Sequence, residues 1–246
     1  MLKELCDVVA VTGYEMNAVN VIKKKLTQIP LNAMYQDSIG NLVCFKKGIS
    51  SEKKILVSAH SDEVGLQISK IEDGKLKFKA IGNIRCCNLI QQRVVFENGC
   101  KGIIFSEHVE KVSKYDYENL YIRLFDSIDD IEIGDVCTFE DNFFENNNTI
   151  VSKGLDNRAG CFILCRLLTA LLECQYDTYF VFTAQEEIGL KGMKVALGHV
   201  KPDISIALDL TPECPENNIK CGKGTAIKIS DSISISDRTL VSQFRG

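Results

Sequence analysis

The sequence predicts an α/β fold, a mixed sheet flanked by helices, with a small all-β domain inserted into it. Two observations lead to this prediction. Towards both ends of the chain, short apolar strands alternate with stretches of helical periodicity. Between residues 66 and 150, short strand-like runs separated by turn residues replace that alternation. We therefore expect residues 1–65 and 151–246 to form one domain and residues 66–150 to form the inserted domain.

The first part of the chain contains helical segments followed by strands. Residues 1–29 have the apolar periodicity of an interrupted helix, and residues 34–45 are typical of a strand pair around a polar turn. The apolar strand 54–59 ends at His60. Asp62 lies two residues further on, so the two side chains should share a face, where the carboxylate could orient the imidazole. A hydrogen-bonded histidine at a polar strand end is the structural alternative.

The inserted stretch has the pattern of a barrel or sandwich, because its strand-like runs are short and their connections carry turn residues. The polar, asparagine-rich segment 141–149 suits a linker back to the first domain. His108 falls in this stretch, and we expect it to be structural or exposed and not a ligand. The turn candidates are Glu72–Lys75, Glu97–Gly99 and Ile133–Asp135.

Strand-then-helix order resumes after residue 151. Asp156 stands just before the apolar helix 161–172, where it could also be a helix cap. The buried strand 176–182 is followed by Glu186 and Glu187, which could also be a solvated pair at a helix start. A further helix is expected at 190–200, and the strand 204–208 ends in Asp209.

One histidine and several carboxylates thus follow three buried strands and one helix start. In open α/β sheets, chemistry is usually located beyond the carboxyl ends of the strands. Imidazole and carboxylate ligands without cysteine suit zinc, cobalt or manganese. Two such ions sharing a carboxylate could activate a water molecule, while a free glutamate moves its proton. The repetition at one structural position favours a hydrolytic metal site over separate structural roles.

Composition excludes several other classes of function. The formal net charge is −4 and no basic patch is dense enough to indicate nucleic-acid binding. No apolar stretch approaches the ~18–20 residues that span a bilayer, and the first residues lack the apolar core of a signal peptide. The 11 cysteines are scattered without zinc-knuckle spacing, so we expect reduced thiols in a cytoplasmic protein.

Four motifs taken together resemble the dinuclear metallo-aminopeptidases of the glutamyl and deblocking aminopeptidase family. The resemblance covers the whole chain and implies a zinc-exopeptidase-like fold that removes N-terminal residues from peptides. Family members assemble as dimer-based tetrahedral dodecamers, and some have been labelled cellulases. Residues 66–150 resemble the family's dimerisation domain, which implies a homo-oligomer. The motifs are Ala59–Gly65, Leu155–Gly160, Thr183–Gly192 and Ala207–Asp209.

The resemblance also implies the metal ligands. By that correspondence, His60 and Asp209 bind one divalent ion, Glu187 binds a second, and Asp156 bridges the two. Up to two ions per subunit are implied, zinc or cobalt, with manganese also compatible. The same resemblance makes Glu186 the general base.

The resemblance further implies that Asp62 supports the metal-binding histidine from behind. The family has one more histidine ligand in a long C-terminal section, whereas this sequence stops at Gly246, within what resembles the beginning of a helix. A truncated gene or a fragment would explain that departure. His199 should not replace this ligand, because five strand residues at ~3.3 Å each place it roughly 16 Å from Asp209.

Two alternative functions therefore stay open. The chain could be an inactive relic or a non-catalytic assembly subunit of the same fold, because the expected ligand set is incomplete. It could also be a glycoside hydrolase, which would need only two carboxylates flanking a sugar and no metal.

Overall fold

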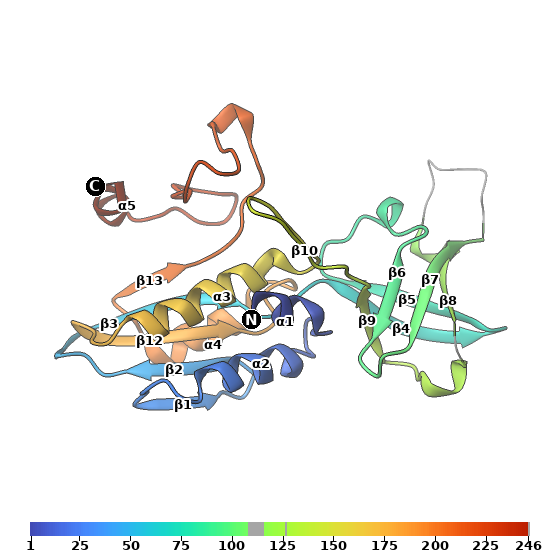
Figure 1. Ribbon diagram of the computed structural model, residues 1–246, viewed down its shortest axis with the longest axis horizontal. Coiled ribbons are helices and arrows are strands. Elements are labelled where there is room, and N and C mark those ends of the chain that lie inside the picture. The colour runs from blue at the N-terminus through green and yellow to red at the C-terminus, as the bar shows by residue number, and fades with distance from the viewer. Residues whose placement is uncertain (108–115, 126, 246) are drawn as a thin grey trace. The chain divides into compact units, whose positions relative to one another are not determined.

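A computed structural model of the chain describes residues 1–107, 116–125 and 127–245 (Figure 1). The chain divides into two compact units, Met1–Leu210 and Thr211–Gly246. The elements of the first unit are α1 (Leu2–Asp7), α2 (Met16–Leu26), β1 (Ala33–Gln36), β2 (Leu42–Lys46), β3 (Ser50–His60), β4 (Gly65–Glu72), β5 (Lys75–Ile81), η1 (Cys86–Asn88), β6 (Arg93–Phe96), β7 (Lys101–Ser106), η3 (Tyr117–Asn119), β8 (Leu120–Leu124), η4 (Ile128–Asp130), β9 (Val136–Phe139), β10 (Phe144–Glu145), β11 (Ile150–Val151), α3 (Leu155–Ala170), β12 (Tyr176–Thr183), α4 (Lys191–Val200) and β13 (Ile204–Ala207).

The predicted mixed sheet has five strands in the order β1-β2-β12-β3-β13. β2 pairs antiparallel with β1 and with β12, whereas β3 pairs parallel with both β12 and β13. In the parallel register Thr183 lies opposite His60, so β12 and β3 end level with each other. The carboxyl ends of three parallel strands therefore meet at one edge of the sheet.

Helices cover both faces of this sheet because side chains along each strand alternate between faces. Phe180 and Phe182 of β12 are fully buried in a cluster with residues of α1, α2 and α3. Val181, between them, packs against Ala196 and Val200 of α4. Each large apolar side chain buried in this way contributes about 1.5–3 kcal/mol relative to full exposure. These two layers hold β12 in the middle of the sheet.

The short strands expected between residues 66 and 150 form a closed barrel in the order β4-β5-β8-β7-β6-β9. Its interior is lined by a separate apolar cluster that includes Leu66, Phe78, Ile104 and Ile122. The boundaries of an inserted domain stay a prediction. The expected linker, residues 141–149, contains β10 and the turn that joins it to β11, and the amides of Asn148 and Thr149 close this turn by donating to Asn146 Oδ1. His108 lies outside the described residues.

The second unit contains little regular structure. Its described residues contain one short 3-10 helix, η5 (Pro215–Asn217), and one α-helix, α5 (Arg238–Arg245), where the sequence before Gly246 resembles the beginning of a helix. Two isolated β-bridges, Cys214 to Ile219 and Ser230 to Ile235, hold its loops. Within the described part of the chain, no helix combines the length and the apolar character needed to cross a bilayer.

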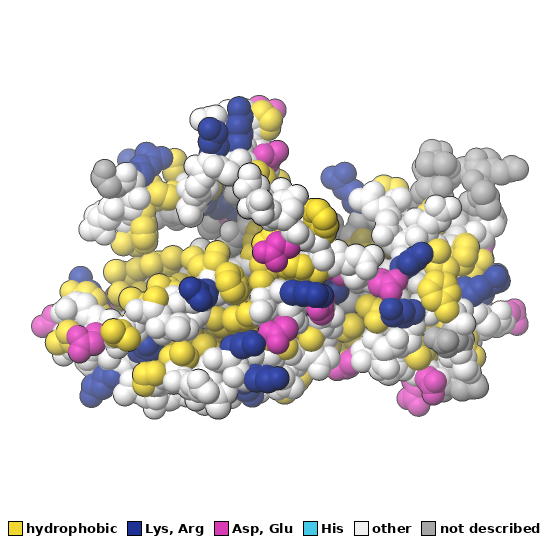
Figure 2. Space-filling view, viewed as in Figure 1, with side chains coloured by type: hydrophobic (Ala, Val, Ile, Leu, Met, Phe, Trp, Pro, Cys, Tyr) yellow, Lys and Arg dark blue, Asp and Glu magenta, His cyan; other side chains and the backbone are white. Residues whose placement is uncertain are grey.

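Two predictions from composition concern the surface and the cysteines. Figure 2 shows lysine and arginine side chains interspersed with acidic ones over the visible face, without a single basic patch. All 11 cysteines are free thiols. Six of them are buried, and burial raises the pKa of Cys44 and Cys161 to about 12, which makes these thiols unreactive.

Candidate metal centre

The candidate site lies where the parallel strands end. His60 is the last residue of β3 and is 4% exposed. Asp209 follows the end of β13, and Glu186 and Glu187 follow the end of β12. Because these strands are parallel, their ends bring the three segments to one edge of the sheet, as in other open α/β folds.

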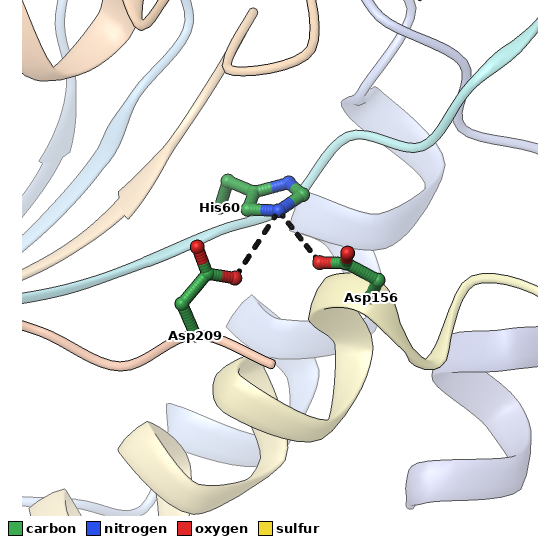
Figure 3. Close-up of side chains that lie close together, drawn as sticks. All are labelled: His60, Asp156 and Asp209. Atoms are coloured by element: carbon green, nitrogen blue, oxygen red, sulfur yellow. Dashed lines mark hydrogen bonds and ion pairs between the residues drawn. The ribbon is translucent and has the colours of Figure 1, made fainter. Parts of the chain in front are cut away.

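Two carboxylates approach the Nε2 atom of His60 (Figure 3). Asp156 Oδ1 lies 3.1 Å from it and Asp209 Oδ1 lies 3.8 Å from it. Two ligands at about 2.1 Å from a tetrahedral ion would be about 3.4 Å apart, so both distances are close to those of ligands on one ion. The side chains of Asp156 and Asp209 are 60% and 48% exposed, so solvent reaches both carboxylates although the imidazole between them is buried.

Asp156 owes its position to an irregular start of α3. Asp156 and Asn157 both have non-helical backbone dihedrals. The Gly160 amide donates to Asn157 Oδ1 at 3.0 Å, so Asn157 satisfies an amide of the first turn. The capping alternative considered for this motif therefore describes Asn157, while the Asp156 carboxylate is directed to His60 (Figure 3).

Asp62 is fully buried behind the imidazole and connects it to the loop after β12. Its Oδ1 lies 3.4 Å from His60 Nδ1. The same carboxylate accepts hydrogen bonds from the amides of Glu186 at 3.1 Å and Glu187 at 3.2 Å, and from the Thr12 hydroxyl at 2.8 Å. Burial by itself raises the pKa of Asp62, but the bond to His60 and these donors outweigh it and lower the pKa. This carboxylate is therefore held ionised.

The proton affinity of His60 shows how acidic its surroundings are. Burial by itself lowers the pKa of this imidazole, yet hydrogen bonds to Asp156 and Asp62 raise it to about 10. The metal-free histidine is thus held protonated at neutral pH by its carboxylate neighbours. A divalent cation at Nε2 would compensate the same negative charge.

Glu186 and Glu187 complete the cluster. Glu186 Oε2 lies 4.0 Å from His60 Nε2, and its side chain is 27% exposed. Burial raises the pKa of both glutamates, and the negative charge of the neighbouring carboxylates raises it further, whereas His60 lowers it. The net effect is a raised pKa for Glu186 and a pKa of about 7 for Glu187. Crowded carboxylates of this kind favour either a shared proton or a bound cation.

The described residues therefore form two potential ligand groups, His60 with Asp156 and Asp209, and His60 with Glu186 and Glu187. The ligand atoms within each group all lie within 4.8 Å of one another. Both groups share the one imidazole. The potential ligand atoms are one imidazole nitrogen and several carboxylate oxygens, a combination that fits zinc, cobalt or manganese.

His199 lies away from this cluster, as predicted. It is exposed near the C-terminal end of α4, whose last residue, Val200, accepts a hydrogen bond from Lys54 at 3.3 Å. Lys54 precedes the stretch of β3 that pairs with β13, whereas His60 ends that strand. His199 therefore lies beside the beginning of the β3 stretch that pairs with β13, whereas His60 lies beyond its end.

Sequence reasoning missed the buried polar residues that hold the site. Asn41 and Glu15 accept hydrogen bonds from the amides of Ala184 at 2.8 Å and Gln185 at 3.0 Å. Glu63 accepts from Lys153 at 2.9 Å. The sequence shows only that an acidic or amide residue lies in a loop. It shows neither that the side chain is buried nor which group it contacts.

The sequence profile of the M42 glutamyl aminopeptidases matches residues 40–246 of this chain. The chain belongs to the M42 glutamyl aminopeptidase family. A relative from Acetivibrio thermocellus, whose name assigns it provisionally to the aminopeptidases, is 36% identical over 243 residues, which are 94% of this chain and 73% of the relative. The matched residues 40–246 contain all four motifs that resemble this family.

Solved structures agree with the M42 assignment. The TET1 peptidase of Pyrococcus horikoshii, described as assembling into a tetrahedron or a large octahedral shell, matches with a TM-score of 0.88 and 29% identity, over 98% of this chain and 78% of that one. A Thermotoga maritima protein named as an endoglucanase matches with a TM-score of 0.77 and 35% identity, over 93% of this chain and 72% of that one. The predicted fold class, a mixed α/β sheet flanked by helices, is thereby confirmed.

Proposed function

We propose that this M42 family member is a metal-dependent aminopeptidase that hydrolyses N-terminal residues from peptides. The observation that supports this most directly is the approach of Asp156 and Asp209 to Nε2 of His60, beside two glutamates with raised pKa values. Family membership supports peptide hydrolysis as the reaction. Clustered groups with perturbed pKa values at a strand end are typical of catalytic sites.

The proposed ligand set divides between two positions. His60 and Asp209 would hold one ion, Glu187 would hold the other and Asp156 would contact both, with zinc or cobalt preferred and manganese also compatible. Bound divalent ions supply Lewis-acid polarisation of the scissile carbonyl. Asp62 orients His60 through Nδ1, which leaves Nε2 directed at the first position.

Glu186 is the proposed general base. Its carboxylate is partly exposed at the mouth of the site, within 4.0 Å of the imidazole, where it can accept a proton from an attacking water. The raised pKa of Glu186 brings its proton affinity closer to neutral pH, which favours proton acceptance followed by donation to the leaving amine. Asp62 fixes the backbone of this residue by accepting its amide hydrogen bond at 3.1 Å.

We further propose that residues 66–150 are an inserted dimerisation domain and that the protein forms a homo-oligomer. The closed barrel supports this, together with the likeness to a peptidase described as a tetrahedral or octahedral shell. Light scattering on the purified chain tests it, and a strictly monomeric mass at micromolar concentration would contradict it.

The catalytic proposal is tested with the purified chain on a panel of aminoacyl p-nitroanilides, with added zinc, cobalt or manganese and with a chelator. Metal-dependent release of p-nitroaniline is expected, and its loss in chelator should be reversible. Absence of both metal binding and hydrolysis would favour the non-catalytic assembly subunit. Hydrolysis of carboxymethyl-cellulose that resists chelator would favour a glycoside hydrolase, the activity named for the T. maritima structure.

A further inference from the structure

Four consecutive backbone amides, those of residues 184–187, donate to side chains from three distant segments. Ala184 donates to Asn41 Oδ1 at 2.8 Å, and Gln185 donates to Glu15 Oε1 at 3.0 Å. The amides of Glu186 and Glu187 donate to the two carboxylate oxygens of Asp62. We call residues 184–187 the glutamate loop. These side-chain acceptors hold the amides of the loop, while its carbonyls at 184–186 accept from amides of residues 189–192.

Glu15 is the member of this set whose carboxylate accepts from the Gln185 amide, next to Glu186. It is 6% exposed, lies directly before α2, and uses one oxygen, Oε1, for two amides. One is Gln185 of the glutamate loop, and the other is Gly13 at 2.7 Å. A single buried oxygen thus joins the loop before α2 to the loop that carries both glutamates. Asp62, by contrast, also contacts the imidazole.

The backbone of Gln185 explains why an acceptor is needed there. Its φ is 54°, in the left-handed region that side-chain-bearing residues seldom adopt. Such a conformation persists only where surrounding contacts hold it. The Glu15 bond restrains the Gln185 amide, and the Lys191 amide restrains its carbonyl at 3.1 Å. Gln185 directly precedes Glu186, so its dihedrals set the direction in which the general base leaves the strand.

We propose that Glu15 is a positioning residue for the glutamate loop, acting through the Gln185 amide to hold Glu186 and Glu187 in their places. The inference rests on the proposed function for its catalytic consequence, but the structural consequence can be measured without activity. The contact requires only an acceptor oxygen, because both donors are backbone amides. Glutamine, which keeps an acceptor oxygen, should therefore preserve the contact with the Gln185 amide, whereas alanine should abolish it.

The experiment compares Glu15→Ala and Glu15→Gln with Val19→Ala as a matched control. Val19 is fully buried in α2, the helix that Glu15 directly precedes, and belongs to the apolar cluster between the helices and the sheet, so its truncation reports general destabilisation of α2. Hydrogen-exchange mass spectrometry on peptides spanning 180–192 follows the glutamate loop. Titration with zinc and steady-state kinetics on an aminoacyl p-nitroanilide follow its consequences.

Glu15→Ala should accelerate exchange in the glutamate loop and weaken zinc binding about tenfold, as the loss of an outer contact does. It should also lower kcat about 10- to 100-fold with little change in KM, through misplacement of the base. Glu15→Gln should restore all three quantities. If Glu15→Ala does not fold, Glu15→Asp, which withdraws the acceptor by one methylene, takes its place.

Unchanged loop exchange in Glu15→Ala, or an equal change in Val19→Ala, would overturn the proposal. So would failure of Glu15→Gln to restore the loop. If the unmodified chain hydrolyses no substrate, the proposed function fails, while the exchange and zinc measurements still decide whether Glu15 positions the loop.

Discussion

His60 has a carboxylate on each side of its ring. Nδ1 faces Asp62, which is buried and ionised, and Nε2 faces the partly exposed Asp156 and Asp209. A partner on one ring nitrogen fixes the tautomer and the ring plane, which presents the other nitrogen to a ligand. In the proposed site, the Asp62 side of the imidazole would orient the ring and the Nε2 side would bind the ion.

Glu186→Gln should abolish hydrolysis while leaving zinc content almost unchanged. The substitution removes the proposed base but not a proposed ligand, and losing a general base costs about 10²–10⁴-fold in rate. Metal analysis of the purified variant, alongside kcat, checks this.

The matched control is Glu187→Gln, which should lose zinc as well as activity because Glu187 is a proposed ligand. If the two variants lose zinc equally, the roles assigned to the neighbouring glutamates are wrong.

At the scale of elements, the loop between β12 and α4 depends on a close approach of backbone to backbone. A Cβ atom on Gly192, at the start of α4, would lie 2.2 Å from the Ala184 carbonyl oxygen and 2.3 Å from Asn41 Oδ1. Both neighbours are fixed, the first by its strand end and the second by hydrogen bonds to Ala184 and Gly192. Only glycine permits α4 to begin so close to the glutamate loop.

Gly192→Ala should lower the free energy of unfolding by about 1–3 kcal/mol, the usual cost of overpacking. Gly198→Ala is the matched control in the same helix, since its added Cβ would meet nothing within 4 Å. It should be neutral or stabilise by about 0.5–1 kcal/mol, because alanine is the better helix former. Urea unfolding of both variants measures the difference, and equal effects would contradict this account.

A second element-scale feature is a buried charge cluster where the chain enters and leaves the barrel. Glu63, 2% exposed, accepts from Lys153 at 2.9 Å and from the Ala10 amide at 3.2 Å, and lies 3.5 Å from Arg158. Arg158 donates in turn to the Ala10 carbonyl. The Glu63 carboxylate thus links the segment that contains Asp62 to the segment that contains Asp156.

Glu63→Gln should destabilise the protein by about 3–5 kcal/mol, because it leaves two buried cations without their counter-charge. Glu107→Gln is the control, since Glu107 also contacts two lysines, Lys75 and Lys77, but at the surface. Exposed ion pairs contribute little, so that variant should unfold almost as the parent does. Comparable losses in the two variants would show that burial is not what makes the Glu63 cluster important.

At the scale of the whole molecule, the site combines segments from both sides of the barrel sequence. His60 precedes the barrel, and Asp156, Glu187 and Asp209 follow it. The two potential ligand groups share His60, whose Nδ1 faces Asp62, so Nε2 is the nitrogen left for an ion, and one nitrogen can bind only one ion. Among the described residues, the second position is thus left with carboxylates alone.

The 246-residue chain should bind one zinc ion tightly and a second weakly. At a zinc concentration of 100 times Kd, the first ion should raise Tm by about 5–10 °C, and chelator should reverse the shift. Calorimetric titration and thermal unfolding measure both effects. His60→Ala, the control, should show no zinc-dependent shift. Two tight positions of similar affinity would contradict this ligand count.

The sequence by itself determined which residues could form the site. Apolar strands that stop at His60, Glu186 and Asp209 are visible in one dimension, and parallel strands necessarily bring such ends to one edge. The helix, strand and barrel-like patterns follow from local periodicity in the same way.

Only the tertiary structure decided what holds those residues in place. The bond from Gln185 to Glu15 spans 170 positions in the chain and the bond from Ala184 to Asn41 spans 143. Such partners leave no periodic trace, because a buried amide needs only one acceptor and many polar side chains could supply it. Asp156 and Asn157 give a second example, because both residue types are favoured at helix N-caps and the sequence does not show which of the two is the cap. The non-helical backbone at the start of α3 directs Asp156 to the imidazole and leaves Asn157 to accept from the Gly160 amide.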